Sequence, residues 1–93
     1  MILVDSNKKG RTNMTYRTSG TCSQMINFDL EDGIVKNVSF MGGCNGNLQG
    51  IGSLVEGMKA EDVIEKLKGI RCGMRPTSCP DQLAKALEAA INA

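Results

Sequence analysis

Residues from about 24 to 40 alternate between apolar and polar side chains, which is the period of a half-buried β-strand. The apolar positions of this segment are Ile26, Phe28, Leu30, Val38 and Phe40. The alternation is interrupted by a turn sequence that contains Asp-Gly, so the pattern predicts a β-hairpin over about residues 24–40. A third strand around residues 14–19 would extend this hairpin into a small antiparallel sheet.

The register of the hairpin depends on the turn at residues 31–33. A two-residue Asp-Gly loop would pair Leu30 with Val35 and mix apolar with polar residues on each face. A three-residue loop with Gly33 in the left-handed conformation pairs Leu30 with Ile34 instead. That register turns every apolar residue of the hairpin except Val35 to one side, and we therefore predict the three-residue loop.

Three amphipathic helices are predicted after the hairpin, over about residues 46–58, 60–68 and 80–92. In each segment the apolar residues recur at steps of three and four, which places them on one face of a helix. A small antiparallel sheet followed by three helices is an α+β fold.

The ends and the composition of these helices add detail. The first is rich in glycine, which weakens a helix, and a close approach of this helix to the sheet would offset that loss. The last begins at Ser78 or Cys79 as the N-cap, because Pro80 and Asp81 suit the first turn of a helix.

The length of 93 residues corresponds to one domain. Residues 1–13 are polar and without periodicity, so we expect a flexible leader there and a single domain over residues 14–93. The apolar run at the start ends at Val4, too short for a signal peptide or a membrane span, which favours a cytoplasmic protein. Eleven basic and ten acidic residues nearly balance, and three aromatic residues are too few for base stacking, so nucleic-acid binding is not expected.

Cysteine is the residue type that carries candidate chemistry, since the chain has four cysteines and no histidine. The four are Cys22, Cys44, Cys72 and Cys79, and each lies at the end of a predicted element. In a reducing compartment, clustered cysteines are more often metal ligands or redox groups than disulfides. They could also be four unrelated buried hydrophobic residues, because free cysteine is often buried. The compact C-x2-C pairs of many zinc sites are absent.

The predicted hairpin would place Cys22 opposite Gly42, with Cys44 near the same open end. The N-terminus of the last helix would favour the thiolate form of a cysteine there. We therefore expect the sulfurs of Cys22, Cys44 and Cys79 within ~4 Å of one another, as Zn–S bonds of ~2.3 Å require, with Cys72 in or beside the group.

Five consecutive residues, Thr77-Ser78-Cys79-Pro80-Asp81, carry a family resemblance. The segment from residue 16 to 91 resembles the TSCPD domain, which is named after these five residues, and residues 17–23, 42–47 and 71–76 match it as well. The resemblance implies kinship with the C-terminal domain of some class II, adenosylcobalamin-dependent ribonucleotide reductases. It therefore implies an association with deoxynucleotide synthesis, in which adenosylcobalamin would belong to the full-length reductase.

The order of elements is also similar to that of iron–sulfur scaffold proteins of the NifU/IscU type. In that comparison Cys22, Cys44 and Cys79 fall at the positions of the scaffold's three cysteines. Gln24 stands where the scaffold has an aspartate that helps to keep its cluster labile, which argues against cluster donation. A set of four thiolates suits a zinc ion or a retained iron–sulfur cluster.

Three classes of function remain open. The chain could be a metal-binding accessory domain, or a thiol–disulfide partner of a reductase that uses Cys72 and Cys79. The third class, a ribonucleoside-diphosphate reductase in its own right, fits poorly because a chain this short cannot enclose a radical generator and a nucleotide site. A basic group could contact a nucleotide phosphate or an acidic partner protein, or be a solvated face; it comprises Lys66, Lys68, Arg71 and Arg75.

Overall fold

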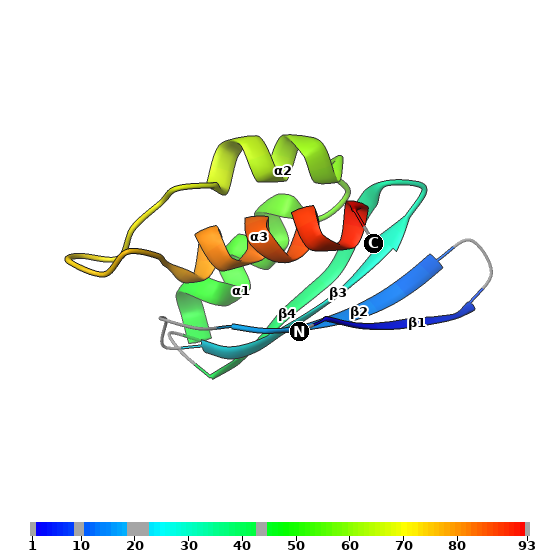
Figure 1. Ribbon diagram of the computed structural model, residues 1–93, viewed down its shortest axis with the longest axis horizontal. Helices are drawn as coiled ribbons and strands as arrows, with labels where there is room; N and C mark the ends of the chain where they lie inside the picture. Colours follow the sequence, from blue (N-terminus) through cyan, green and yellow to red (C-terminus); the bar gives the residue numbers. More distant parts are fainter. Residues whose placement is uncertain (1, 9–10, 19–22, 43–44, 93) are drawn as a thin grey trace.

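In the part of the chain that the structure describes, four antiparallel strands form one sheet in the order β1-β2-β3-β4 (Figure 1). The computed structural model describes residues 2–8, 11–18, 23–42 and 45–92. The strands are β1 (Ile2–Lys8), β2 (Arg11–Arg17), β3 (Ser23–Glu31) and β4 (Ile34–Gly42). The helices are α1 (Asn45–Val55), α2 (Ala60–Leu67) and α3 (Cys79–Ile91). The predicted α+β class and its three helices are confirmed.

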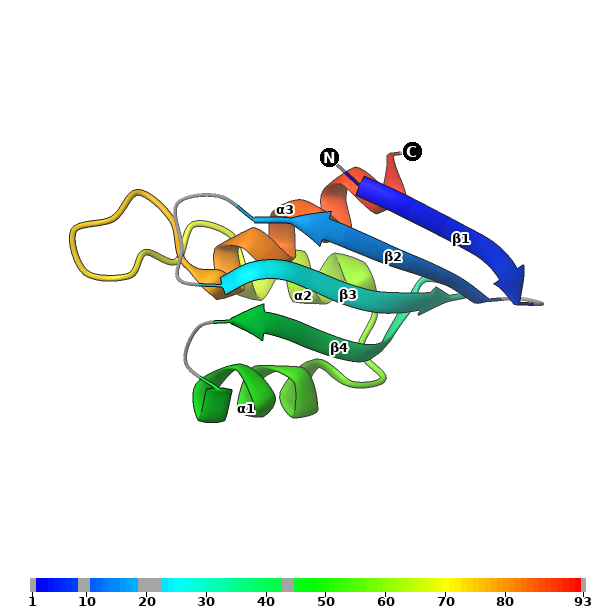
Figure 2. The same ribbon diagram turned by 90° about the horizontal axis from the view of Figure 1, so that it is seen from below.

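The helices lie on one side of the sheet, and α3 is the central one. It crosses one face of the sheet. Helix α2 packs on the side of α3 that faces away from the sheet, and α1 runs beside β4 (Figures 1 and 2). Apolar side chains from the sheet and the helices form the core, and the largest fully buried ones are Phe28, Ile26, Leu83, Leu87, Val35 and Val63. None of the helices in the described segments is long and apolar enough to cross a membrane.

The N-terminal part of the chain differs from the expected flexible leader over residues 1–13. Residues 2–8 form β1 and residues 11–17 form β2, which pairs with β3 along its whole length. The predicted third strand is thus confirmed, but it begins earlier and a fourth strand precedes it. Polar residues on the outer face hold β2 in place, since the Asn13 amide donates to Asn27 Oδ1 (3.1 Å) and Asp29 Oδ1 (2.8 Å). The apolar alternation of β2 is short, with Met14 and Tyr16 as its members, so it does not reveal where the strand begins.

The predicted hairpin is confirmed, but its predicted register is wrong. Asp32 and Gly33 form a two-residue turn with φ of 53° and 79°, and Leu30 pairs with Val35. Positive φ at both central residues gives the turn a twist that matches the flanking strands. This pairing places the fully buried Val35 opposite Leu30. An extra residue in β4 near Asn37, whose φ is 55°, then shifts the register, so that beyond it Phe40 pairs with the buried Ile26.

The segment between α1 and α2 pairs with the start of the outer edge of β4. Val35 donates its backbone N–H to Met58 O (2.8 Å) and accepts from Gly57 N–H (2.8 Å). Further along the strand, the Asn37 N–H donates to the Glu56 carboxylate (2.8 Å). These bonds satisfy the first part of an edge that would otherwise be open to pairing with another chain, and they tie the end of α1 to the sheet.

Gly52 lies where α1 closely approaches the sheet. A Cβ built at this residue would lie 2.9 Å from the carbonyl oxygen of Val38, closer than two such atoms can pack. At Gly50, two residues earlier, a Cβ would meet nothing within 4 Å. The expected close approach of this glycine-rich helix is therefore confirmed at Gly52.

We expect Gly52→Ala to lower the free energy of unfolding by about 1–3 kcal/mol, because α1 must move away from β4. Gly50→Ala is the matched control, and we expect it to raise stability by up to ~1 kcal/mol through better helix propensity. Urea denaturation followed by circular dichroism measures both. Equal stability of the two variants would contradict the close contact.

Candidate functional site

Ser78 joins the start of α3 to the segment before it. Its side-chain oxygen accepts a hydrogen bond from the Asp81 N–H (3.1 Å), as an N-cap does, and its hydroxyl donates to Ile70 O (2.6 Å). Of the two N-caps that the sequence allowed, Ser78 is therefore the N-cap, and Cys79 is the first residue of the helix. One hydroxyl both caps α3 and fixes the chain that leaves α2.

Asp81 fixes the same segment at a second point. One carboxylate oxygen accepts from the Gly69 N–H (2.7 Å), and the other accepts from the hydroxyl of Thr77. The amide of Gln82 donates to the same Thr77 oxygen (3.0 Å), and Lys85 lies 3.3 Å from the carboxylate. Asp81 is only 3% exposed, so its lone pairs are satisfied by the protein rather than by water.

The environment of Asp81 acts on its pKa in two directions. Burial alone raises the pKa, because the charged form loses hydration. The hydrogen bonds from Thr77 and from the Gly69 N–H, with the nearby ammonium group of Lys85, lower it. The net result is a pKa below the ordinary value for aspartate, so the carboxylate is charged at neutral pH.

The loop between α2 and α3 is closed by two backbone hydrogen bonds. The Cys72 N–H donates to Thr77 O (3.2 Å), and the Arg75 N–H donates to Cys72 O (3.0 Å). Gly73 has a φ of 60°, which allows the chain to reverse between these two bonds. Together with Ser78 and Asp81, these bonds hold Cys72 close to the N-terminus of α3.

Cys72 and Cys79 line one cavity of about 500 Å³, between one face of α1 and the first turn of α3. From α1 the cavity is lined by Gly46, Gly50 and the exposed Leu54, among others, and a Cβ at either glycine would meet nothing within 4 Å. Cys72 is exposed and Cys79 is buried, and neither is in a disulfide. The N-termini of two helices therefore border a cavity that contains two thiols.

Cys22 and Cys44 lie outside the residues that the structure describes, and the predicted convergence of their sulfurs with that of Cys79 lies there with them. Their neighbours in the sequence are placed: Ser23 pairs with Gly42 at the end of the hairpin, and Asn45 is the first residue of α1. Within the described ranges, which contain two of the four cysteines, no three Cys, Asp or Glu side chains are grouped to hold a metal.

The sequence pattern did not reveal that Thr77 and Asp81 help to hold the segment after α2 against the start of α3. The sequence does contain a related signal: Asp81 follows Ser78 by three residues, which is the pattern of a capping box. In a capping box the acidic side chain bonds back to the N-cap N–H, whereas here it bonds to Gly69, twelve residues away. The pattern predicts a helix start but not this distant partner.

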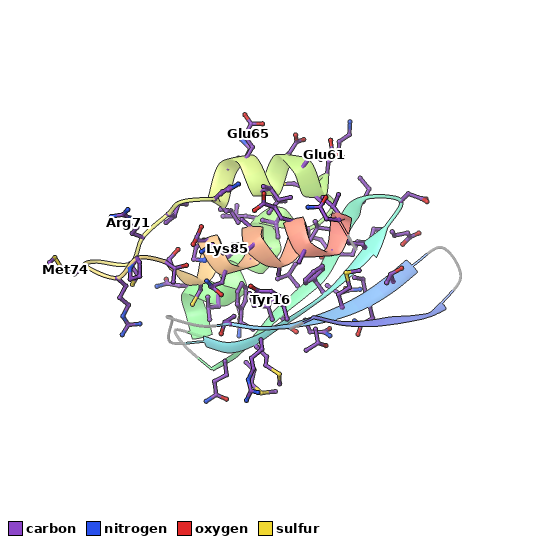
Figure 3. The ribbon with its side chains drawn as sticks, in the orientation of Figure 1. Tyr16, Glu61, Glu65, Arg71, Met74 and Lys85 are labelled. Carbon is purple, nitrogen blue, oxygen red and sulfur yellow. The ribbon has the colours of Figure 1, made fainter. Side chains whose placement is uncertain are left out.

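The basic group is exposed at the end of α2 and in the loop that follows. Lys66, Arg71 and Arg75 are exposed, and Lys68 forms an ion pair with Glu88 at 3.0 Å. Figure 3 shows Arg71 and Met74 on this loop, away from the sheet. Contact of the group with a nucleotide stays a prediction.

Comparison with known proteins identifies a family. The family model described as TSCPD domain matches residues 5–91, almost the whole chain. No curated protein and no solved structure matches. The similarity to NifU/IscU-type scaffold proteins therefore stays a prediction.

We expect the stability of the metal-free protein to fall as the pH decreases below about 4, the ordinary pKa of aspartate. The folded-state pKa of Asp81 is lowered, so its stabilisation is complete above the ordinary value and is lost as the pH falls through the folded-state value. Asp81→Asn should be less stable than the parent by about 1–3 kcal/mol at neutral pH, and this difference should shrink in acid.

Urea denaturation at a series of pH values, with a chelator present, measures this difference. Glu65→Gln, which alters an exposed carboxyl group of α2, is the control for removal of one negative charge. A difference between Asp81→Asn and the parent that does not change with pH would contradict the role of the charged carboxylate.

Proposed function

Because the chain belongs to the TSCPD domain family, we propose that it is a small metal-binding accessory domain. Its ligands are the four cysteines Cys22, Cys44, Cys72 and Cys79, and its metal is a zinc ion or an iron–sulfur centre. The observation that carries this proposal is that Cys72 and Cys79, seven positions apart in the sequence, line the same cavity.

The residues present fit such a group in donor chemistry. Four thiolates are a common ligand set for structural zinc and for iron–sulfur clusters. The unpaired N–H groups at a helix N-terminus favour negative charge, and two helices, α1 and α3, begin at this cavity. Cys44 directly precedes α1 in the sequence, and Cys22 directly precedes β3. This adjacency supports the assignment of both residues to the same ligand set.

The hydrogen bonds that hold the loop between α2 and α3 support a ligand role for Cys72. Hydrogen bonds from Ser78 to Ile70 and from Gly69 to Asp81 hold this segment without using either thiol. A ligand held in place before binding loses less conformational entropy when the metal binds. A bound metal would cross-link the loop to α3, and it would thereby stabilise a domain with a modest core.

The family resemblance extends the proposal to a partner. TSCPD domains resemble the C-terminal domain of some class II ribonucleotide reductases, so we place this chain as an accessory protein in ribonucleotide reduction. In that role adenosylcobalamin and the nucleotide site belong to the reductase, and this chain supplies the metal-binding module.

A second candidate function is thiol–disulfide exchange with a reductase. The exposure of Cys72 next to the buried Cys79, with both thiols in one cavity, favours it. Metal binding ranks higher, because six residues separate the two cysteines and the compact C-x-x-C geometry is absent.

We expect Cys79→Ser to lower both the metal content and the melting temperature of anaerobically purified protein. Val63→Ala is the matched control: it removes a fully buried core side chain that does not line the cavity, so it should lower the melting temperature while the metal content stays at the parent level. Metal analysis and calorimetry on the same samples separate the two effects. A parent without metal, with a Cys79→Ser variant that melts like it, would refute the metal site.

A redox titration of the metal-free protein tests the second function. We expect no Cys72–Cys79 disulfide at a cytosolic glutathione potential, about −220 to −320 mV. A disulfide that forms and breaks reversibly within this range, in a parent that binds no metal, would favour the thiol–disulfide role. Mass spectrometry after alkylation of the free thiols measures the oxidised fraction.

A further inference from the structure

The loop between α2 and α3 presents an apolar side chain between two unpaired cations. Met74 is fully exposed at its tip, and Arg71 and Arg75 flank it. Neither guanidinium group has an ion-pair or hydrogen-bond partner in the described parts of the chain. Arg and Met are enriched in protein interfaces, and a methionine without contacts adapts to many apolar surfaces.

This loop is closed rather than loosely extended. The two backbone bonds at Cys72 and the anchoring of Gly69 and Ile70 hold its base, so Met74 is carried at the end of a defined turn. In Figures 1 and 3 the loop extends beyond the helices at one end of the long axis, and the molecule measures 41 Å along that axis. A loop held in this way loses little entropy when it docks.

A groove of complementary chemistry lies at the opposite end of the same two helices. Ile64 and Ile91 contribute apolar surface, Glu61 and Glu88 contribute carboxylates, and the cavity between them measures about 250 Å³. Ile91 is 46% exposed, which is high for a large aliphatic side chain. Glu65, one turn along α2 from Glu61, adds a further negative charge that projects from the helix in Figure 3.

Charge is therefore separated along the α2–α3 axis, although the whole chain carries a net charge of only +1. Residues 66–80 include four basic residues and no acidic one, whereas residues 61–65 include three acidic residues and no basic one. Glu88 is already paired with Lys68, but Glu61 and Glu65 have no ion-pair partner among the residues described. The loop and the groove thus match in both charge and apolar character.

We infer that the chain associates with itself head to tail: the 71–75 loop of one copy docks in the groove between α2 and α3 of the next. Met74 packs against Ile64 and Ile91, and Arg71 and Arg75 pair with Glu61 and Glu65. Such a contact joins two different surfaces, so it generates an open chain or a ring rather than a two-fold dimer. The small area of loop and groove makes the contact weak and sensitive to salt.

The test uses sedimentation velocity of the full chain over a range of concentrations, at low and high salt, with reductant and chelator present. We expect concentration-dependent association of the parent that decreases with added salt. Met74→Ser, Arg71→Glu/Arg75→Glu and Glu61→Lys/Glu65→Lys should each remain monomeric. Arg17→Glu/Lys36→Glu changes the net charge as the loop variant does, but on β2 and β4, and it should associate like the parent.

Mixing the two charge-reversed variants gives the decisive result. The reversed loop of one then meets the reversed groove of the other, and we expect association to return in the equimolar mixture. A parent that is monomeric at every concentration would overturn the inference. The exposed loop would then be a surface for a different partner with acidic groups. A loop variant that still associates, or a mixture that stays monomeric, would overturn it as well. Circular dichroism confirms that each variant is folded.

Discussion

The buried carboxylate of Asp81 determines how the cysteine end of this domain is built. It accepts hydrogen bonds from the backbone of Gly69 and from Thr77, and it lies within ion-pair distance of Lys85. Without it, the segment that leaves α2 would lose its link to α3 at Gly69. The position of Cys72, the shape of the cavity and the direction of the loop beyond it follow from this link. A buried charge that loses its partners is costly, so each of these contacts depends on the others.

The helices and the fold class could be predicted from the sequence, because their signals are local. Apolar residues at steps of three and four predict α1, α2 and α3 within a few residues, and Ser78 before Pro80 predicts the start of α3. The strands were harder. β2 relies on Asn13 and its side-chain bonds to β3, and the bulge at Asn37 changes the register without a sequence pattern that reveals it.

The candidate site was predictable only in part. The position of each cysteine at the end of a predicted element suggested that they converge, and the described chain does bring Cys72 and Cys79 to one cavity. What holds them there could not be predicted, because the bond from Gly69 to Asp81 joins a helix end to a helix start across a loop. The five residues that give the family its name therefore combine two tasks. Ser78 and Asp81 fix the backbone, and Cys79 presents its thiol to the space that results.

The hydrogen bonds that hold the α2–α3 loop to the start of α3 join residues close together in the sequence, which affects the order of folding. Gly69 and Asp81, the most distant residues that these bonds join, are twelve positions apart, so the bonds can form before α3 docks on the sheet. Half of the proposed ligand set, Cys72 and Cys79, then belongs to a unit that assembles locally. The other half, Cys22 and Cys44, borders the strands of the hairpin. A metal that needs all four would bind only after the sheet and α3 have met, and its capture would mark the completion of folding.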